Sequence, residues 1–183
     1  LQDVITVDNV LTGNNTIDGG GFDYVDSNVA ARKIYATSFV VGDINNVATG
    51  SNSSSIGYYT TASGDYSTSF GNSTTASGYA STAMGQNTIA SGVESIAIGD
   101  GTVASGDIST AMGLNTTASG DISTAIGEGT VANELQHTAV GTFNDTTETN
   151  KLFTVGNGTG VGVESNALQI YKTGVLQLPY YST

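Results

Sequence analysis

Catalytic chemistry has few residues to draw on in this sequence. The chain has one histidine, His137, and no cysteine among its 183 residues. A general base needs an ordered partner, and the nearest carboxylates in the sequence belong to Glu128 and Glu134. One histidine without cysteine supports neither a nucleophilic triad nor a zinc site, so we predict no catalytic, cofactor-binding or metal-binding residue. We interpret His137 as a surface substitution and the protein as a non-enzyme.

Two carboxylates, Asp107 and Asp121, are the other residues that suggest chemistry. Each directly follows a glycine, and each is followed by isoleucine and serine. Asp107 and Asp121 occupy equivalent positions of adjacent repeat units, which would place their carboxylates roughly 5 Å apart. Some glycosidases use two carboxylates at such a separation, so cleavage of a polysaccharide is one interpretation of the pair. A loosely held Ca²⁺ is a second reading, because calcium takes oxygen ligands. We favour a third reading, two solvated turn residues, since aspartate after glycine is typical of turns.

Four tyrosines, Tyr58, Tyr59, Tyr66 and Tyr79, fall in segments that look like turns. A flat ring with a polar tip is suited to stacking on a sugar, and turns are where such rings are displayed. We therefore interpret these tyrosines as candidate ligand-binding residues. The alternative is that they are isolated, half-exposed turn aromatics.

A column of threonines recurs at a fixed spacing. It comprises Thr60, Thr74, Thr88, Thr102, Thr116 and Thr130. A flat, exposed threonine array can order water, which suggests ice binding, but the second threonine that such an array needs is alanine here. We therefore interpret the column as hydroxyl pairing between successive repeat units.

All of these residues are placed by one repeat. The unit Ser-Thr-Ala-Met-Gly-Gln-Asn-Thr-Ile-Ala-Ser-Gly-Val-Glu, residues 81–94, recurs head to tail along the chain. The units begin at Ser53, Ser67, Ser81, Ser95, Ser109, Ser123 and His137. Glycine recurs twice in each unit at an even spacing, except that Glu134 takes one glycine position. Half a unit suits one short strand and one tight turn, so each unit predicts one coil of an all-β solenoid whose coils stack in register.

Side-chain alternation on the strands predicts which residues face outward. Neighbours on a strand point to opposite faces, and each unit places a small residue, such as Ala83, beside a large apolar one, such as Met84. The large residues are Ile56, Phe70, Met84, Ile98, Met112, Ile126 and Val140. Alanines allow a flat coil to close over them, which leaves the large row outside. We predict that this row is an interface between copies of the chain, and the alternative places it inside a monomer.

Composition excludes some classes of partner. The chain has 16 acidic and 4 basic residues, a net charge of −12, which argues against nucleic acid because phosphates would be repelled. The charge also favours an extracellular setting. No apolar run approaches the roughly 20 residues of a membrane helix, so we expect no membrane contact in this segment.

Three regions are expected along the chain. Residues 1–35 alternate strand-like runs with Gly and Asn turns, which predicts a β connector. Residues 36–143 form the solenoid, with regular coils over 53–143. Residues 144–183 form a C-terminal β module, in which KLFTVGNGTG predicts a strand leading into a turn and NALQIYKTGVLQL predicts two strands split by Thr-Gly.

The units SIAIGDGTVASGDI and STAMGLNTTASGDI resemble the head repeats of trimeric autotransporter adhesins. This resemblance covers residues 53–143 and implies a left-handed parallel β-roll in an intertwined homotrimer. Similar repeats occur in tail fibres of phages and phage-like injection systems. The segment KLFTVGNGT…SNALQIYKTG resembles the region that precedes the self-cleaving chaperone domain of phage fibres.

The resemblance implies a structural and adhesive role. We expect a segment of a trimeric tail or attachment fibre on a virion or particle, which displays receptor-binding surfaces. Its partners would be a host-cell receptor, such as a glycan, and other fibre proteins, with no cofactor. The alternative is the head of a bacterial cell-surface trimeric adhesin that binds host matrix or cells. A polysaccharide-degrading fibre is the third hypothesis.

Overall fold

The described part of the chain is built of strands and turns. The structure, a computed structural model, describes residues 38–42 and 45–178, which belong to one compact unit, Tyr35–Thr183. No helix occurs in these residues, which confirms the all-β prediction. Accordingly, none of them forms a helix with the length and apolarity needed to cross a membrane. The connector predicted over residues 1–35 lies outside the described residues.

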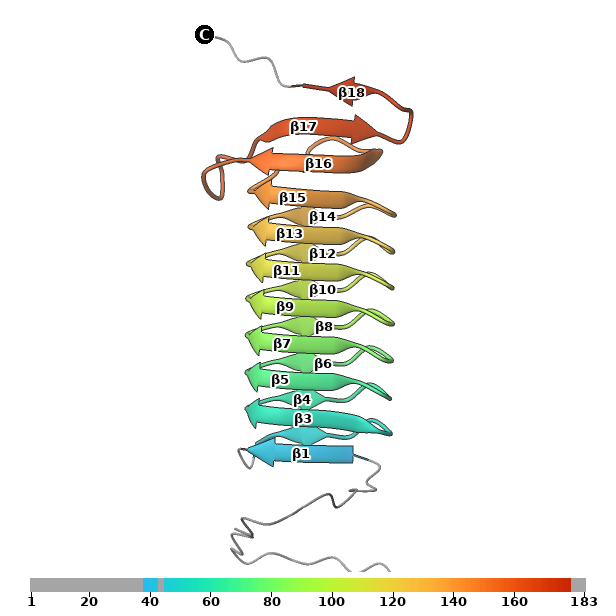
Figure 1. The fold of residues 1–183 in the computed structure, drawn as a ribbon, viewed down its shortest axis with the longest axis vertical. Helices are drawn as coiled ribbons and strands as arrows, with labels where there is room; N and C mark the ends of the chain where they lie inside the picture. The colour runs from blue at the N-terminus through green and yellow to red at the C-terminus, as the bar shows by residue number, and fades with distance from the viewer. Residues whose placement is uncertain (1–37, 43–44, 179–183) are drawn as a thin grey trace, which may run out of the picture. The chain divides into compact units, whose positions relative to one another are not determined.

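Two sheets form the two walls of the unit (Figure 1). The larger sheet has 11 strands, in the order β1 (Ser38–Gly42), β3 (Ser53–Tyr58), β5 (Thr68–Asn72), β7 (Thr82–Gln86), β9 (Ile96–Asp100), β11 (Thr110–Leu114), β13 (Thr124–Glu128), β15 (Thr138–Thr142), β16 (Lys151–Asn157), β17 (Asn166–Tyr171) and β18 (Leu176–Gln177). The smaller sheet has seven short strands, in the order β14 (Val131–Ala132), β12 (Thr117–Ala118), β10 (Val103–Ala104), β8 (Ile89–Ala90), β6 (Thr75–Ala76), β4 (Thr61–Ala62) and β2 (Val47–Ala48).

Successive coils pair in parallel and in register. Ala83 of β7 pairs with Ala97 of β9, and Met84 pairs with Ile98, so equivalent residues of successive units lie side by side. Each coil contributes one strand to each sheet, and from β1 to β15 the strands stack one above another (Figure 1). This arrangement confirms the predicted parallel β-solenoid.

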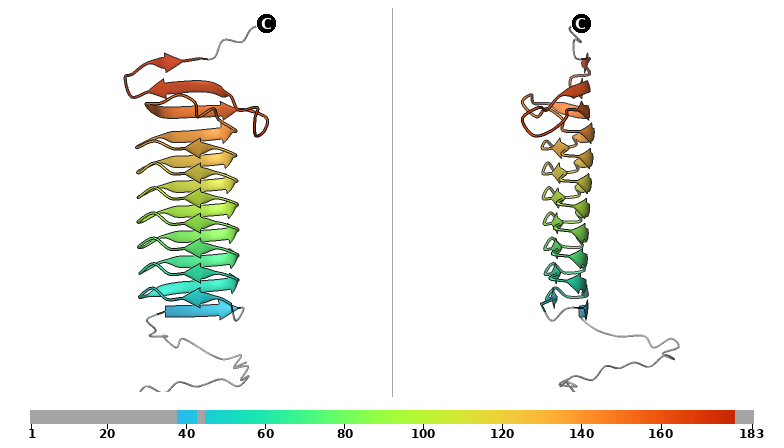
Figure 2. Two further views of the ribbon diagram at one scale, coloured as in Figure 1. Left: turned by 180° about the vertical axis from the view of Figure 1, so that it is seen from behind. Right: turned by 90° about the vertical axis from the view of Figure 1, so that its left-hand side faces the viewer.

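Alanine fills the space between the two sheets. Eleven alanines, among them Ala83 of the larger sheet and Ala90 of the smaller one, have no exposed surface. A methyl side chain lets two sheets approach closely, and the side view shows the two walls lying against each other (Figure 2). The predicted alanine interior is therefore confirmed.

Glycine is required where one coil lies on the next. At Gly57 the backbone φ is 136°, and an added Cβ would lie 1.9 Å from the carbonyl oxygen of Gly71. At Gly78 no positive φ is involved, yet an added Cβ would lie 1.9 Å from the carbonyl oxygen of Gly92. Glu134 takes the glycine position in the last coil, above which the smaller sheet does not continue.

An asparagine side chain closes the last coil of the smaller sheet. The backbone N–H of Val131 donates to Asn144 Oδ1 at 2.6 Å, and Asn144 Nδ2 donates to the Val131 carbonyl at 2.9 Å. In the preceding coil, the backbone N–H of Thr117 donates instead to the backbone carbonyl of Thr130, at 2.8 Å. Among the described residues, no further strand of the smaller sheet pairs with β14, and the Asn144 amide makes the hydrogen bonds to Val131 that the backbone of such a strand would make.

The larger sheet continues beyond the coils. Strand β16 pairs with β15 in parallel, and β17 then pairs with β16 in the antiparallel sense. The strands expected in the C-terminal module are found as β16, β17 and β18.

Candidate functional site

The large apolar residues form one row on the outer face of the larger sheet. In β7, Ala83 is completely buried whereas the next residue, Met84, is 38% exposed, as strand alternation requires. All seven predicted residues occupy this row, in register from strand to strand: Ile56, Phe70, Met84, Ile98, Met112, Ile126 and Val140. None of them belongs to the alanine core, so the alternative of a monomer with these residues inside is wrong.

The row extends beyond the seven residues from Ile56 to Val140. Val41 of β1 pairs with Ile56, and at the other end Val155 of β16 pairs with Val140. Leu168 of β17 pairs in turn with Val155. Val155 and Gly156 repeat the dipeptide Val140-Gly141, one position later than the period of the repeat would place it. This dipeptide is the sequence signal that could have revealed the longer row. An apolar face that crosses ten strands from β1 to β17 is typical of an interface.

The four tyrosines divide into two pairs. Tyr58 ends β3 and contacts Tyr59, with ring centroids 4.5 Å apart and edge to face. Tyr66 precedes β5 and contacts Tyr79 in the same manner, with centroids 5.5 Å apart. Because β3 and β5 are parallel and in register, the pairs lie at opposite edges of the coils. All four rings are about half exposed, so each edge displays a two-ring patch.

The two aspartates act as acceptors between coils. Asp107 Oδ1 accepts the backbone N–H of Val93 at 2.9 Å, and Asp121 Oδ1 accepts that of Asp107 at 3.0 Å. Asp65 accepts the N–H of Ser51 in the same manner at 2.8 Å. The carboxylates therefore tie one turn to the preceding turn, which favours the turn-residue reading over the glycosidase pair. In the described residues, no group of three acidic or histidine side chains is arranged to hold a metal ion.

The threonine column lies inside the coils. Thr60 is completely buried, and its hydroxyl contacts Ser55 Oγ of the same coil at 2.7 Å. Where alanine replaces that serine, the threonine hydroxyl has no hydrogen-bond partner, as at Thr88 and Thr102. The predicted pairing between coils is therefore wrong, and burial removes the exposed array that ice binding requires. Thr60 shares strand parity with the buried Ala62, so alternation alone would have placed it inside.

His137 is buried, so its interpretation as a surface substitution is wrong. Its side chain has no exposed surface, and Nε2 lies 2.9 Å from Thr154 Oγ1 of β16, which covers the last coil. Lys151 is also buried, and its Nζ donates to the Asp145 carbonyl at 2.8 Å. Burial, reinforced by the Lys151 charge, lowers the pKa of His137 to about 4. Burial also lowers the pKa of Lys151.

Acidification should destabilise this end of the solenoid through His137. The pKa of His137 is about 4 in the fold, against 6.5 for the free side chain. Between these values the unfolded chain binds more protons, so stability is complete above pH 6.5 and falls as the pH drops toward 4. We expect a loss on the order of 2 kcal/mol, measured by denaturant unfolding across this range.

The matched control for the pH effect is His137→Ser, which restores the residue found at this position in the other units. The variant should remove most of the pH dependence in this window. Asp145, whose pKa is lowered chiefly by the backbone N–H of Thr147, acts at more acidic pH and does not confuse the result. An equal pH dependence in wild type and variant would contradict the assignment to His137.

A known family model matches most of the coils and neither end of the chain. Residues 48–74, 76–102, 90–116 and 104–130 match the family model of the YadA head domain repeat. Over these residues the resemblance to adhesin heads is thereby confirmed. YadA-type adhesins are extracellular cell-surface proteins. A comparison with curated proteins finds no match to the chain.

The YadA head repeat is a structural adhesin repeat, and its matched residues include both sets of edge turns. The outward row from Ile56 to Ile126 and the four tyrosines lie within the span of the matched residues. The buried His137 and the strands β16 to β18 lie beyond them.

Proposed function

We propose that three copies of the chain pack through the outer apolar face into a homotrimeric attachment module. The observation that carries this proposal is the in-register row of large apolar side chains, half buried or exposed in the single chain, from Val41 to Leu168. Removing such a face from water is favourable, at roughly 25 cal/mol per Å², and copies of one chain supply a matching surface. Measurement of the mass in solution tests this directly: three times the single-chain mass supports the trimer, and a stable monomer contradicts it.

We propose further that the trimer displays receptor-binding surfaces at the edges of the coils. The frame is fixed by alanine and glycine stacking, and the exposed side chains at the edge turns, such as the tyrosines, lie outside the alanine core. Three equivalent sites on a stiff support gain strength from simultaneous binding, even where each site is weak. This mechanism suits both a bacterial surface adhesin and an attachment fibre of a virion or particle.

Two observations favour different settings for this module. The YadA head repeats favour a cell-surface adhesin. The C-terminal strands β16 and β17, which carry the segments resembling phage fibres, favour the tail or attachment fibre as the second candidate.

The tyrosine pairs are the proposed receptor contacts. Replacing Tyr58, Tyr59 and Tyr79 with alanine should weaken glycan or cell binding about tenfold, because each exposed ring offers stacking area and a polar tip. Binding is measured on a glycan array and to host cells, with circular dichroism to verify the fold.

Leu114→Ala is the matched control for the tyrosine variants, since Leu114 is an exposed residue in the turn position equivalent to that of Tyr58. It should leave binding unchanged. Undiminished adhesion in the triple tyrosine variant would reject the tyrosines as receptor contacts.

A further inference from the structure

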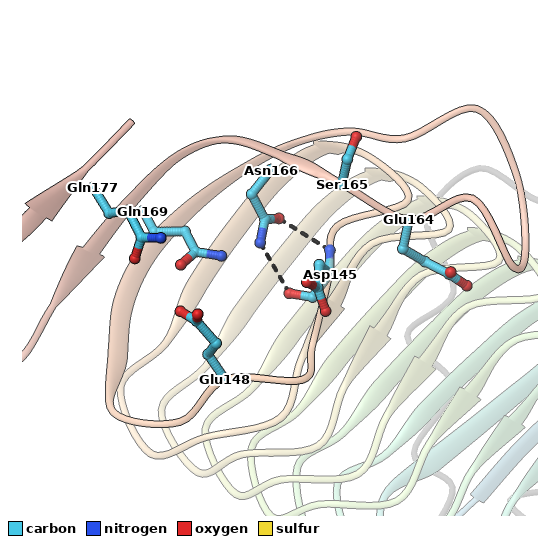
Figure 3. Close-up of a pocket in the computed structure, with 7 residues that line it drawn as sticks. All are labelled: Asp145, Glu148, Glu164, Ser165, Asn166, Gln169 and Gln177. Carbon is cyan, nitrogen blue, oxygen red and sulfur yellow. Dashed lines mark hydrogen bonds between the residues drawn. The ribbon is translucent and has the colours of Figure 1, made fainter. Parts of the chain in front are cut away.

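A polar pocket of about 240 Å³ lies at the C-terminal end of the described chain, away from the tyrosines (Figure 3). Its walls come from the loop that leaves the last coil, from the turn and strand of β17, and from β18. The lining residues are Asp145, Glu148, Glu164, Ser165, Asn166, Gln169 and Gln177.

One wall of the pocket is held by a reciprocal pair of hydrogen bonds. The backbone N–H of Asp145 donates to Asn166 Oδ1 at 3.0 Å, and Asn166 Nδ2 donates to the Asp145 carbonyl at 3.1 Å. Asp145 Oδ1 also accepts the backbone N–H of Thr147 at 2.7 Å, which lowers the pKa of this carboxyl. The wall therefore presents an ionised carboxylate on an ordered loop.

The opposite wall carries a hydrogen-bond donor without a protein partner. Gln169 is only 6% exposed, and its Oε1 accepts the hydroxyl of Tyr171. Its Nε2 makes no hydrogen bond with the described residues, and Figure 3 shows this nitrogen turned into the pocket. The nitrogen is open to the pocket while the rest of the side chain is buried, so it is a fixed donor for a ligand that supplies an acceptor.

An acceptor stands beside this donor. The Glu148 carboxylate makes no hydrogen bond with the described residues and is turned toward Gln169 (Figure 3). A group that satisfies both must accept from the amide and donate to the carboxylate. A hydroxyl does both with one oxygen atom.

Charge and geometry exclude other ligands. The carboxylates of Asp145, Glu148 and Glu164 do not converge on one point, and no metal-binding group of three is found in the described residues. Their negative charge repels an anion, and an organic cation would leave the Gln169 N–H without an acceptor. The volume of about 240 Å³ is below that of pockets for drug-sized ligands, which suits a single sugar ring.

We propose that this pocket binds a neutral hexopyranose unit of a glycan, with one ring hydroxyl accepting from the Gln169 amide and donating to the Glu148 carboxylate. The proposal deepens the proposed receptor binding by naming a site and a ligand class, and it rests on that function.

The test is saturation-transfer NMR on the complete chain with the methyl glycosides of glucose, galactose and mannose. N-acetylneuraminic acid and agmatine serve as the anionic and cationic probes. At least one neutral glycoside should bind, and neither charged probe should compete with it. Glu148→Ala and Gln169→Met should each weaken binding about tenfold, since each removes one hydrogen bond to the sugar.

The matched controls are Glu128→Ala and Gln86→Met, which change the same residue types at exposed strand ends of the coils and should not alter binding. Glu148 is exposed, so its replacement tests the site even where the buried Gln169 variant folds poorly. No binding by any neutral glycoside, tighter binding of agmatine, or wild-type affinity in the Glu148 variant would each overturn the proposal. Failure of trimer formation or of the tyrosine contacts leaves this result unaffected, so the two proposals are tested separately.

Discussion

Replacing Met84 and Met112 with aspartate is expected to convert the trimer into single chains. Both side chains lie in the outward apolar row and are 38% and 37% exposed in the single chain, where an aspartate remains solvated. In the assembly each variant chain would bring two carboxylates into an apolar contact, and an unpaired buried charge costs several kcal/mol. The native charge of −12 adds repulsion between the chains. Sedimentation equilibrium should therefore give the mass of one chain.

Gln86→Asp with Leu114→Asp is the control for this experiment. Gln86 ends β7 and Leu114 ends β11, so the same strands receive the same charges at exposed positions outside the row. The control should retain the mass of three chains. A trimer that survives the Met84 and Met112 changes would show that another surface holds the chains together.

Replacing Gly92 with alanine should destabilise the solenoid by about 3 kcal/mol or more. The added Cβ would lie 2.0 Å from the carbonyl oxygen of Gly106 and 2.5 Å from its carbonyl carbon, and both belong to the backbone of the next coil. No positive φ is involved at Gly92, so the cost arises from separating the coils and not from backbone strain. Denaturant unfolding followed by circular dichroism measures the change.

Gly160→Ala is the matched control, because an added Cβ there meets nothing within 4 Å and the residue has no positive φ. Its stability should stay within about 0.5 kcal/mol of wild type. If Gly92→Ala proved equally harmless, the coils would have to be farther apart than the structure shows.

The regular coils could be predicted from the sequence because their signals are local. Successive side chains of a strand point to opposite faces, so Ala83 and Met84 can be assigned to opposite faces without knowing which distant residues they contact. The fixed period then places Ile98 beside Met84 by simple addition. The same alternation predicts burial of Thr60, which shares its parity with Ala62.

The C-terminal end could not be predicted in the same manner because its contacts break the period. The residues of β16 that pair with β15 come one position later than the repeat period would place them. Thr154 therefore covers His137, a contact that the repeat pattern does not predict. The sugar pocket needs Asp145 beside Asn166, a pairing produced by the antiparallel return of β17. Such pairings depend on tertiary packing, which a single sequence does not display. The roles of the tyrosines and of the outer row remain predictions.

The Asn144 amide has a consequence for how long the stack of coils can become. Parallel strands in register offer an open edge on which further identical strands can grow, which is how fibrils elongate. At β14 that edge is already occupied by a side chain that pairs with both the N–H and the carbonyl of Val131. Growth of the smaller sheet therefore stops within the chain itself, and molecules that meet end to end at this point have no template to extend.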